Sequence, residues 1–355
     1  MYAVLILISA IFAAALPAAA NMAQPLDSPT DQMLFFNDSP NASLVEETIL
    51  FKFTGDSPAD ARVEVSYVLE NLLENEQQFD VMFVSPEFAD ADFEVYIDDE
   101  RISEVTVDED IGWPTNWQPV ITEEIIDPVS GKPLKVSPGS WGSRIRTFSG
   151  ATFPVNLKAG EPTDIKVAYN SRSGYYRYGD VINTVYTQLY YLTPARFWDG
   201  SAGVNLRIEF PEGSSMAVHS NIPLEKENDR TFVAALDGVP GSEWTFSCAD
   251  TKGLIFGTNN LKKHDILVLA VTAVLLMAVP LSRRYSKNPI FTCLAVLPGA
   301  AFFFAAIKVT YGFMFLMYLL GPVILFTTIA LLIFIGYKKK SGKKPSLRKT
   351  EYSNL

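Results

Sequence analysis

Three long apolar runs occupy the last quarter of this chain of 355 residues and constrain its fold most strongly. They are Ile266–Leu281, Ile290–Ile307 and Phe313–Ile335. A helix needs about 20 apolar residues to cross the hydrocarbon core of a bilayer, which is roughly 30 Å thick. The first two runs are slightly short and the third is long enough, and each can extend by a turn at its borders. The sequence therefore predicts three transmembrane helices, spanning 265–282, 289–308 and 312–336 within the membrane region 264–337.

Prolines and small residues within these runs predict how the helices bend and pack. Pro280, Pro298 and Pro322 each remove a backbone hydrogen bond and are expected to kink their helix. The spacing of Ala295 and Gly299 provides a small-residue face for close helix packing. No acidic residue lies in the interior of a run, whereas a conduction path normally shows buried ionisable groups. We therefore interpret the bundle as an anchor or a surface for docking a partner, rather than a transporter by itself.

The N-terminus carries a further apolar stretch with the properties of an export signal. Residues Tyr2–Leu16 are almost wholly apolar, and Ala18 and Ala20 follow as an A-x-A-like cleavage site. No Lys or Arg precedes the stretch, so an uncleaved N-terminal span is the alternative. Either reading exports residue 21 onward, and we predict a signal peptide at 1–20.

Basic residues beside the apolar runs predict which side faces the cytoplasm. The loop after the first run holds three Lys and Arg and the tail after the third holds seven, against three on the other side. We therefore expect a multi-pass protein of the cell membrane, with residues 21–264 extracytoplasmic and the C-terminus cytoplasmic. The tail, 338–355, is expected to contact anionic lipid headgroups through Lys338, Lys339, Lys340, Lys343, Lys344, Arg348 and Lys349.

Charge is divided unevenly between the two parts of the chain. The whole chain has a net charge of −11. From His264 onward, eleven Lys and Arg against two acidic residues give a net charge of +9, which leaves −20 for residues 1–263. Nucleic-acid binding requires a basic surface. We therefore expect no nucleic-acid partner for the acidic exported part.

Apolar residues in the exported part recur with the period of a β-strand, every second residue. Clear cases lie at 49–53, 63–69, 153–157, 165–169 and 204–210. Strands separated by turns every eight to twelve residues or so favour antiparallel sandwiches over a parallel sheet. The predicted fold is thus a mainly β exported region followed by the transmembrane helices.

The arrangement of this β-region is open between two alternatives. Residues 21–41 are rich in Pro, Asp, Asn and Ser, which predicts an extended arm. Residues 42–255 exceed one typical sandwich, and a Pro-rich and Gly-rich seam at 111–144 divides them. We expect two sandwich-like lobes, at 42–110 and 145–255, or else one elaborated sandwich.

Two cysteines, Cys248 and Cys293, are too few for a disulfide framework. Cys293 lies inside the second apolar run, and Cys248 lies near the end of the exported part. A region of this size can bury an adequate core without cross-links. Scarcity of cysteine in an exported protein favours a bacterial source over an animal one.

Two segments together carry one loose pattern, FPVNLKAGEPTDIKVAY (153–169) followed by VYTQLYYLTPARFWDGSAGVNLRIEFPEG (185–213). The pattern is a strand, an Ala-Gly-Glu turn, a strand ending in Tyr, a Tyr-rich strand, a Trp near a Gly, and a strand running into Phe-Pro. Over a third or so of the chain, the sequence resembles uncharacterised bacterial membrane-anchored surface proteins catalogued as domains of unknown function. The resemblance implies an extracytoplasmic β-domain and no known activity.

Neither a known catalytic motif nor a nucleotide-binding motif is present in the sequence. We interpret His219 as a strand or turn residue and His264 as the border of the membrane region. The acidic stretch Glu87–Asp110 offers the carboxylates that calcium prefers but lacks the EF-hand spacing. We interpret it as a solvated hairpin with its turn at Asp98–Arg101. No cofactor, metal or enzymatic activity is predicted.

Aromatic side chains supply the candidate binding surface. Flat rings beside carboxylates can bind sugars or a protein, although the same rings also fill sandwich cores. Neighbouring glycines place Tyr175 and Tyr176 at an expected turn, so they should be more exposed than Tyr190 or Tyr191. The candidate ligand or partner surface is Trp117, Trp141, Tyr175, Tyr176, Tyr178 and Trp198.

These features together predict a non-enzymatic, membrane-anchored extracytoplasmic binding or scaffold protein, or an accessory subunit of a membrane complex. Its expected partners are the lipid bilayer and an unidentified membrane or surface protein. The alternative is a cell-envelope carbohydrate-binding protein or an enzyme that acts on glycans with paired carboxylates, because acidic residues are plentiful.

Overall fold

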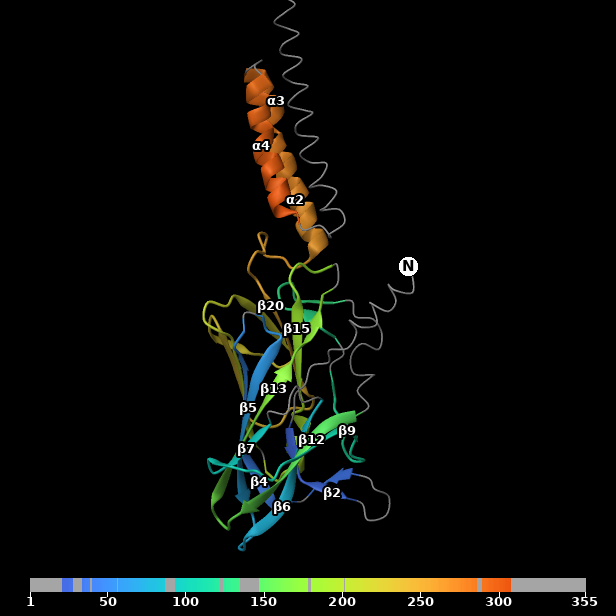
Figure 1. Cartoon of the computed structure of the whole chain (residues 1–355), viewed down its shortest axis with the longest axis vertical. Coiled ribbons are helices and arrows are strands. Elements are labelled where there is room, and N and C mark those ends of the chain that lie inside the picture. Colours follow the sequence, from blue (N-terminus) through green and yellow to red (C-terminus); the bar gives the residue numbers. More distant parts are fainter. Residues whose placement is uncertain are drawn as a thin grey trace, which may run out of the picture. The chain divides into compact units, whose positions relative to one another are not determined.

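The computed structural model contains two compact units, Met1–Asn259 and Asn260–Leu355 (Figure 1). It describes residues 21–27, 34–38, 40–55, 57–86, 93–121, 124–134, 147–177, 180–200, 202–285 and 289–307. The predicted signal peptide, the third apolar run and the basic tail lie outside these residues. Trp141 and Tyr178 of the candidate surface lie outside them as well.

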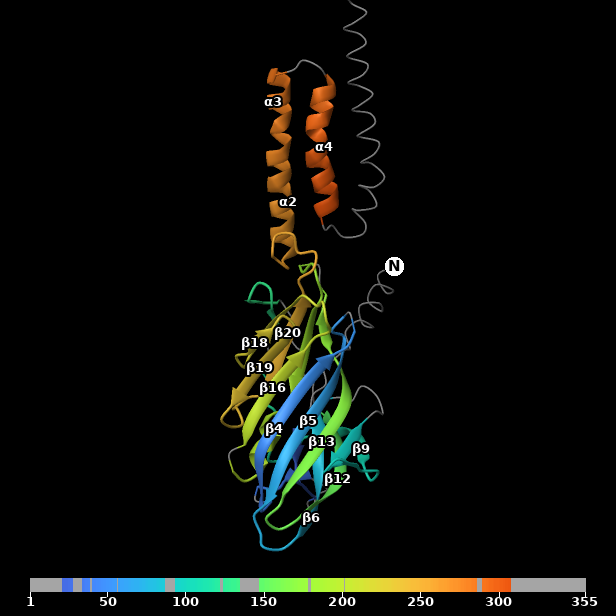
Figure 2. The ribbon, with the colours of Figure 1, turned by 90° about the vertical axis from the view of Figure 1, so that its left-hand side faces the viewer.

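An eight-stranded sheet, the large sheet, forms one layer of the first unit (Figure 2). Its strand order is β18-β19-β16-β4-β5-β13-β7-β8, and β16 pairs with β4 in parallel while the other neighbours pair antiparallel. The strands are β4 (Ala42–Phe53), β5 (Asp60–Asn71), β7 (Glu94–Ile97), β8 (Glu100–Arg101), β13 (Pro162–Arg172), β16 (Gly203–Glu209), β18 (Glu225–Asn228) and β19 (Thr231–Leu236).

Two four-stranded sheets face the large sheet and complete a sandwich. The β6 sheet has the order β1-β6-β12-β9, and the β20 sheet has the order β14-β15-β20-β17. Their strands are β1 (Asn21–Ala23), β6 (Gln77–Ser85), β9 (Thr106–Gly112), β12 (Thr147–Leu157), β14 (Gly174–Tyr176), β15 (Val185–Tyr190), β17 (Met216–Ser220) and β20 (Trp244–Asp250). Two strand pairs, β2 (Pro25–Asp27) with β3 (Leu34–Phe36) and β10 (Ile126–Asp127) with β11 (Lys132–Pro133), and the 3-10 helix η1 (Thr193–Phe197) complete the unit.

Aromatic rings join the two layers. Phe51 of the large sheet lies 5.5 Å from Trp244 of β20, and Phe83 of β6 lies 5.5 Å from Tyr169 of β13, measured between ring centroids. The predicted strands are confirmed, because the apolar residues at alternate positions of β4, β5, β12, β13 and β16 are buried in this core. Burying one such side chain contributes about 1.5–3 kcal/mol. The prediction of a mainly β fold ahead of the apolar helices is thus confirmed.

The two predicted lobes are corrected by the strand order. All eleven residues of β13 pair with β5, from Pro162 opposite Glu70 to Arg172 opposite Asp60. Strand β16 likewise lies beside β4. Strands from both sides of the seam therefore share one sheet and one core, as in the alternative of a single elaborated sandwich. Alternation along a strand indicates which face is buried, but it does not indicate the partner strand.

The predicted extended arm is also corrected. Residues 21–23 form β1, which pairs with β6, and Met22 and Ala23 are fully buried. Phe36 of β3 is buried as well. Its ring lies 5.6 Å from that of Trp117. Apolar residues between the polar ones therefore attach this segment to the sandwich.

The acidic hairpin is confirmed at its turn. Asp98 and Asp99 connect β7 to β8 with φ angles of 50° and 65°, which is the left-handed pair that a tight hairpin turn requires. Asp98 accepts a hydrogen bond from the Asp164 backbone N–H (3.1 Å), and Asp99 lies 3.4 Å from Lys166 Nζ. The second strand of the hairpin is short, because β8 covers only Glu100–Arg101. The next strand, β9, starts at Thr106 and joins the β6 sheet.

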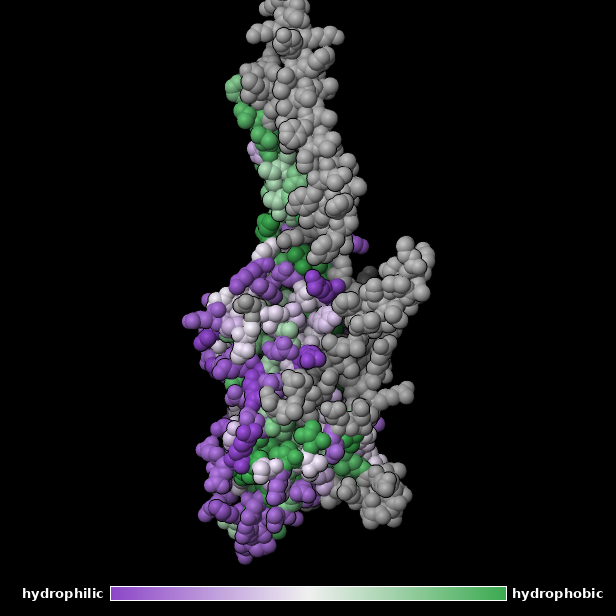
Figure 3. Space-filling view, in the orientation of Figure 1, coloured by the Kyte–Doolittle hydropathy of each residue, from purple (hydrophilic) through white to green (hydrophobic). Residues whose placement is uncertain are grey.

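The second unit contains the helices α2 (Leu261–Leu276), α3 (Ala278–Tyr285) and α4 (Pro289–Ala306). Within its described residues, the segment Leu261–Ser282 is long and apolar enough to cross a membrane, and the apolar helix Leu294–Ala306 is shorter. The described part of the chain thus shows one candidate span where three were predicted. Hydrophobic residues are prominent on the surface of these helices, whereas much of the first unit is hydrophilic (Figure 3).

Two predicted packing features appear in this unit. Helix α2 ends beside Met277, three residues before Pro280, as expected because a proline ring clashes with the preceding turn. A Cβ atom added at Gly299 would lie 3.0 Å from the Leu276 side chain, so Gly299 lets α4 approach α2 closely. His264 Nε2 and the Ala306 carbonyl, 2.8 Å apart, also join the two helices.

Candidate functional site

The predicted aromatic surface is largely buried. Trp117 is 6 % exposed and packs against the rings of Phe36, Trp113 and Tyr191. Its Nε1 donates a hydrogen bond to Thr193 Oγ1 at 2.8 Å. Seam residues 113–117 thus cover the outer face of the second layer with packed aromatic rings. Trp117 is a core residue rather than part of a binding surface.

Trp198 and Tyr176 require the same correction. Trp198 is buried and donates from Nε1 to the Met22 carbonyl (3.1 Å). Tyr176 is buried and donates from its hydroxyl to Asp180, 3.0 Å from each carboxylate oxygen. Tyr175 is 42 % exposed, as expected. The two glycines predicted a turn, but residues 174–176 form strand β14, in which neighbouring side chains point to opposite faces.

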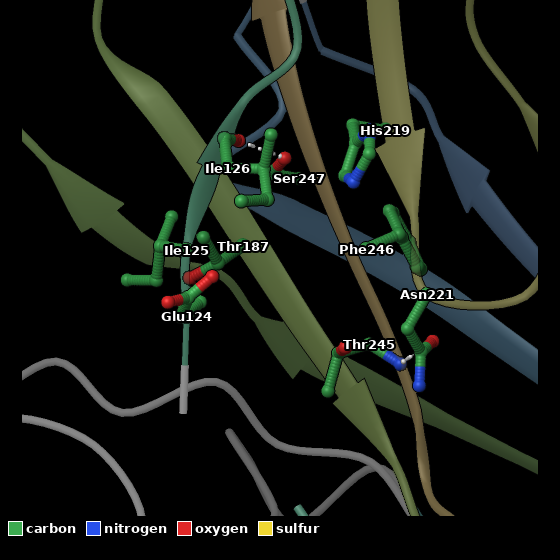
Figure 4. Close-up of a pocket in the computed structure, with 9 residues that line it drawn as sticks. All are labelled: Glu124, Ile125, Ile126, Thr187, His219, Asn221, Thr245, Phe246 and Ser247. Carbon is green, nitrogen blue, oxygen red and sulfur yellow. Dashed lines mark hydrogen bonds between the residues drawn. The ribbon is translucent and has the colours of Figure 1, made fainter. Parts of the chain in front are cut away.

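A cavity of about 160 Å³ lies on the outer face of the β20 sheet (Figure 4). In β20, Trp244, Phe246 and Cys248 belong to the core between the layers, so the alternate residues Thr245 and Ser247 face outward. The lining residues are Glu124, Ile125, Ile126, Thr187, His219, Asn221, Thr245, Phe246 and Ser247. At about 30 Å³ for each water in the liquid, the cavity suits only a small ligand.

Strand register brings three polar side chains of the cavity into one row. Thr187 of β15 lies opposite Ser247 of β20, and Ser247 lies opposite His219 of β17. Side chains directly opposite on one face have Cβ atoms about 4.5–5.5 Å apart. The row therefore presents two hydroxyl groups and an imidazole to one small volume.

Seam residues 124–126 close one side of the cavity. Ser247 Oγ donates a hydrogen bond to the Ile126 carbonyl at 2.6 Å (Figure 4). Ile125 is buried in a cluster with Tyr176, Val185 and Ala249. The seam is thus part of the site, although its composition suggested a connecting segment.

Asn221 fixes the other side. Its Oδ1 accepts from the Thr245 backbone N–H (2.8 Å), and its Nδ2 donates to the Glu243 carbonyl (2.7 Å). These bonds hold the loop after β17 against the start of β20. The walls of the cavity are therefore set by hydrogen bonds within the protein.

Thr187 is the unusual member of this site. It is 3 % exposed, and its hydroxyl has no hydrogen-bond partner among the described residues. Buried polar groups in native proteins nearly always have a partner, and leaving one unsatisfied costs about 1–3 kcal/mol. A hydroxyl that lines a cavity under these conditions is suited to bind a ligand or water.

The charge of the lining limits the ligand. Glu124 supplies a carboxylate, and neither Lys nor Arg is among the lining residues. Hydroxyl, amide and imidazole groups provide both hydrogen-bond donors and acceptors. Across the part of the chain that the structure describes, no three His, Cys, Asp or Glu side chains are arranged to hold a metal ion. The site therefore suits a small polar molecule that is neutral or positively charged.

A second cavity, of about 270 Å³, lies where β4, η1 and the start of β16 meet. Trp198 lines it beside Arg196 and Asp199. Arg196 donates to the Pro240 carbonyl at 2.6 Å, so its guanidinium is already engaged. Gly200 has a φ of +92°, and an added Cβ would lie 2.5 Å from Ser43 Oγ. The Trp near a Gly in the sequence pattern, Trp198 and Gly200, thus has a structural role, because it forms a turn that packs closely against Ser43.

Glu243 is a buried carboxylic acid that contacts the seam at Val120, between residues 113–117 and residues 124–126. Burial raises its pKa to about 7, although hydrogen bonds from Thr193 oppose the rise. The Thr193 backbone N–H donates to one carboxylate oxygen (3.0 Å) and the Thr193 hydroxyl to the other. The Glu243 backbone N–H donates to the Val120 carbonyl (2.9 Å). Sequence reasoning missed this network, because its residues are far apart in the chain.

Comparisons with known proteins leave the family open. No protein-family model matches the sequence, and no curated protein matches it significantly. A Legionella pneumophila protein, provisionally described as nutrient-binding, is similar in structure with a TM-score of 0.40 and 12% identity, over 66% of this chain and 71% of that one.

Two further solved structures show lower TM-scores. Leukotriene A4 hydrolase from Saccharomyces cerevisiae has a TM-score of 0.31 and 8% identity, over 64% of this chain and 32% of that one. An M1 zinc metallopeptidase from Deinococcus radiodurans has a TM-score of 0.29 and 8% identity, over 58% and 42%. This chain covers less than half the length of either. Likenesses at this level assign no function to this chain.

Proposed function

We propose that this protein is a membrane-anchored, extracytoplasmic binding protein that holds a small neutral or cationic polar ligand in the cavity beneath residues 124–126. The observation that supports the proposal most directly is the buried hydroxyl of Thr187, which lines the cavity without a partner among the described residues. A ligand hydroxyl or ammonium group would provide that partner, and Glu124 would favour the ammonium.

The anchor in this proposal is the segment Leu261–Ser282. Its mean hydropathy is 2.3, and 11% of its most apolar window is buried. A helix in the core of a soluble domain would bury most of its surface, so this exposed apolar helix suits a lipid environment. The proposal takes the second and third apolar runs as further spans, with the C-terminus in the cytoplasm. An accessory subunit of a membrane complex is compatible with the same anchor.

Binding fits the cavity better than hydrolysis. A serine nucleophile needs a base within hydrogen-bond reach of its hydroxyl. Ser247 lies beside His219 in register but directs its hydroxyl to the Ile126 carbonyl. The proposal therefore assigns the row of Thr187, Ser247 and His219 to ligand contact and no residue to catalysis.

The proposal is tested by thermal unfolding of the full chain in detergent. The probes are ethanolamine, glycerol, glycine and acetate, each added over a concentration series. A ligand that binds only the folded state stabilises it by about 2.7 kcal/mol at a hundred times its dissociation constant. We expect ethanolamine or glycerol to raise the melting temperature and acetate to leave it unchanged.

The near-isosteric variant Thr187→Val should lose this response, since it removes the hydroxyl and keeps the shape. Thr163→Val is the matched control, because Thr163 is equally buried but lies on β13 of the large sheet. The control should keep the response. A Thr187→Val variant that responds like the unaltered protein would refute the site.

A further inference from the structure

The loop between β20 and α2 carries three consecutive apolar residues, Leu254, Ile255 and Phe256. Ile255 is 55% exposed, and the other two are half-buried. The loop is folded by two turns, in which the Leu254 N–H donates to the Thr251 carbonyl (3.2 Å) and the Gly257 N–H donates to the Leu254 carbonyl (2.9 Å). A large apolar side chain held at such a tip is available for contact with another surface.

The sandwich holds both ends of this loop. Thr251 donates to the Ser215 carbonyl from its backbone N–H (2.7 Å) and from its hydroxyl (2.8 Å). At the other end Asn259 is fully buried. Its Oδ1 accepts from the Asn183 N–H (2.7 Å), and its Nδ2 donates to Asp127 Oδ1 (3.2 Å). The exposure of Ile255 is therefore a property of an ordered segment.

The loop is tied closely to the proposed membrane anchor along the chain. Asn260 caps α2 by accepting from the Lys263 backbone N–H at 2.9 Å, and the helix begins at Leu261. Ile255 and Leu261 are six positions apart in the sequence, so at 3.3–3.6 Å for each residue they lie at most about 22 Å from each other. Ile255 therefore cannot lie far from the point where the anchor enters the membrane.

Basic side chains flank the apolar tip. Lys252 precedes it, and Lys262 and Lys263 open the helix. All three are exposed. Lysine side chains beside an apolar segment suit the interface of a bilayer, where ammonium groups contact lipid phosphates and the apolar residues enter the acyl boundary.

We propose that the loop Leu254–Phe256 inserts into the outer leaflet of the bilayer and gives the extracytoplasmic sandwich a second membrane contact beside α2. This inference rests on the proposed anchor. The surface that covers the exposed apolar tip is the lipid bilayer. The chain keeps the tip close to the anchor, and exposed lysines flank the tip.

The molecule offers a matched control for Ile255. Leu72 is 54% exposed and lies just beyond Asn71, the last residue of β5. Asn259, at the end of the Ile255 loop, bonds to Asn183 in the segment between β13 and β15. Ser173, at the start of the same segment, donates its N–H to the Ala59 carbonyl, next to the first residue of β5. The twelve residues of β5, at about 3.3 Å each, place the two tips at opposite ends of the sandwich.

The test uses the full chain reconstituted in vesicles of phosphatidylcholine and phosphatidylglycerol that carry a nitroxide label near the headgroup. Ile255→Cys, Leu72→Cys and Leu269→Cys are each made with Cys293→Ala and labelled with an environment-sensitive fluorophore. Cys248 should not react, because it is buried and burial raises the pKa of its thiol. Leu269 is an exposed residue of α2 and reports on the anchor itself.

We expect strong quenching at positions 255 and 269 and little at position 72. If position 269 is quenched but position 255 is quenched no more than position 72, the loop insertion is overturned and the anchor stands. Absence of quenching at 269 would overturn both. A second variant, Ile255→Ser, should fold with an unchanged melting temperature in detergent, because the side chain contributes little to the core.

Discussion

The seam covers the outer face of the second layer in two contrasting ways. Residues 113–117 fill their part with rings, and the Trp117 indole N–H donates to Thr193. Residues 124–126 leave a cavity over the β20 sheet, and the Thr187 hydroxyl beneath them is unsatisfied among the described residues. Residues 113–117 thus fill the space over the sheet with packed rings, whereas residues 124–126 leave an unfilled cavity there.

The largest expected effect comes from the removal of an aromatic ring from residues 113–117, compared with the removal of an exposed ring elsewhere in the sandwich. Trp117→Ala should lower the free energy of unfolding by about 3–5 kcal/mol, because it opens a large cavity in a packed cluster. Tyr175→Ala, at an exposed ring, should change it by less than about 0.5 kcal/mol. Chemical denaturation of both variants measures the difference. Equal losses would show that Tyr175 also belongs to the core.

Glu243, which bonds to the seam between its two parts, should make stability depend on pH. Its folded pKa of about 7 lies above the ordinary value of 4.5, so the folded state holds a proton that the unfolded state releases. The stabilisation that this bound proton gives the folded state is complete below pH 4.5 and is lost as the pH rises to about 7. At about 1.4 kcal/mol for each pKa unit, the loss is on the order of 3 kcal/mol.

Glu243→Gln should flatten this dependence, because an amide does not titrate. Denaturation between pH 4.5 and pH 8 measures the slope for both proteins. If the slope persists in the variant, other groups cause the pH dependence, and the ionisation of Glu243 does not affect the stability of the protein.

Thr187, beneath residues 124–126, should show a smaller effect than Trp117 or Glu243, and the effect should have the opposite sign. Thr187→Val should raise the free energy of unfolding without ligand by about 1 kcal/mol, because it removes a buried hydroxyl that lacks a partner. Thr163→Val controls for the general effect of placing valine in a strand. Destabilisation by Thr187→Val would mean that the hydroxyl is satisfied, and the contrast between the two parts of the seam would disappear.

The sequence was sufficient to predict the strands and insufficient to predict their partners. Alternation placed Val63, Val65 and Tyr67 in the core, because one face of β5 is buried along its whole length. The pairing of β5 with β13 joins segments about a hundred residues apart, and the local pattern contains no information on such a pairing.

The candidate site was harder to predict for a related reason. Glu124, Thr187, His219 and Ser247 come from four distant segments and match no motif. A possible signal was the polar pair Thr187-Gln188 inside the otherwise apolar strand β15. Tyrosine and tryptophan misled the search, because an aromatic residue in a β-protein is found in the core as readily as at a binding surface.

The parallel pairing of β4 with β16 has a consequence for folding during synthesis of the chain. Thr48 and Asn205, neighbours across these strands, are 157 residues apart. Ribosomes add about 5–20 residues each second, so β4 waits on the order of ten to thirty seconds before its neighbour exists. Until then one edge of β4 remains open to pairing with other chains. A version truncated before Gly203 should therefore aggregate rather than fold, because β4 would keep an unpaired edge.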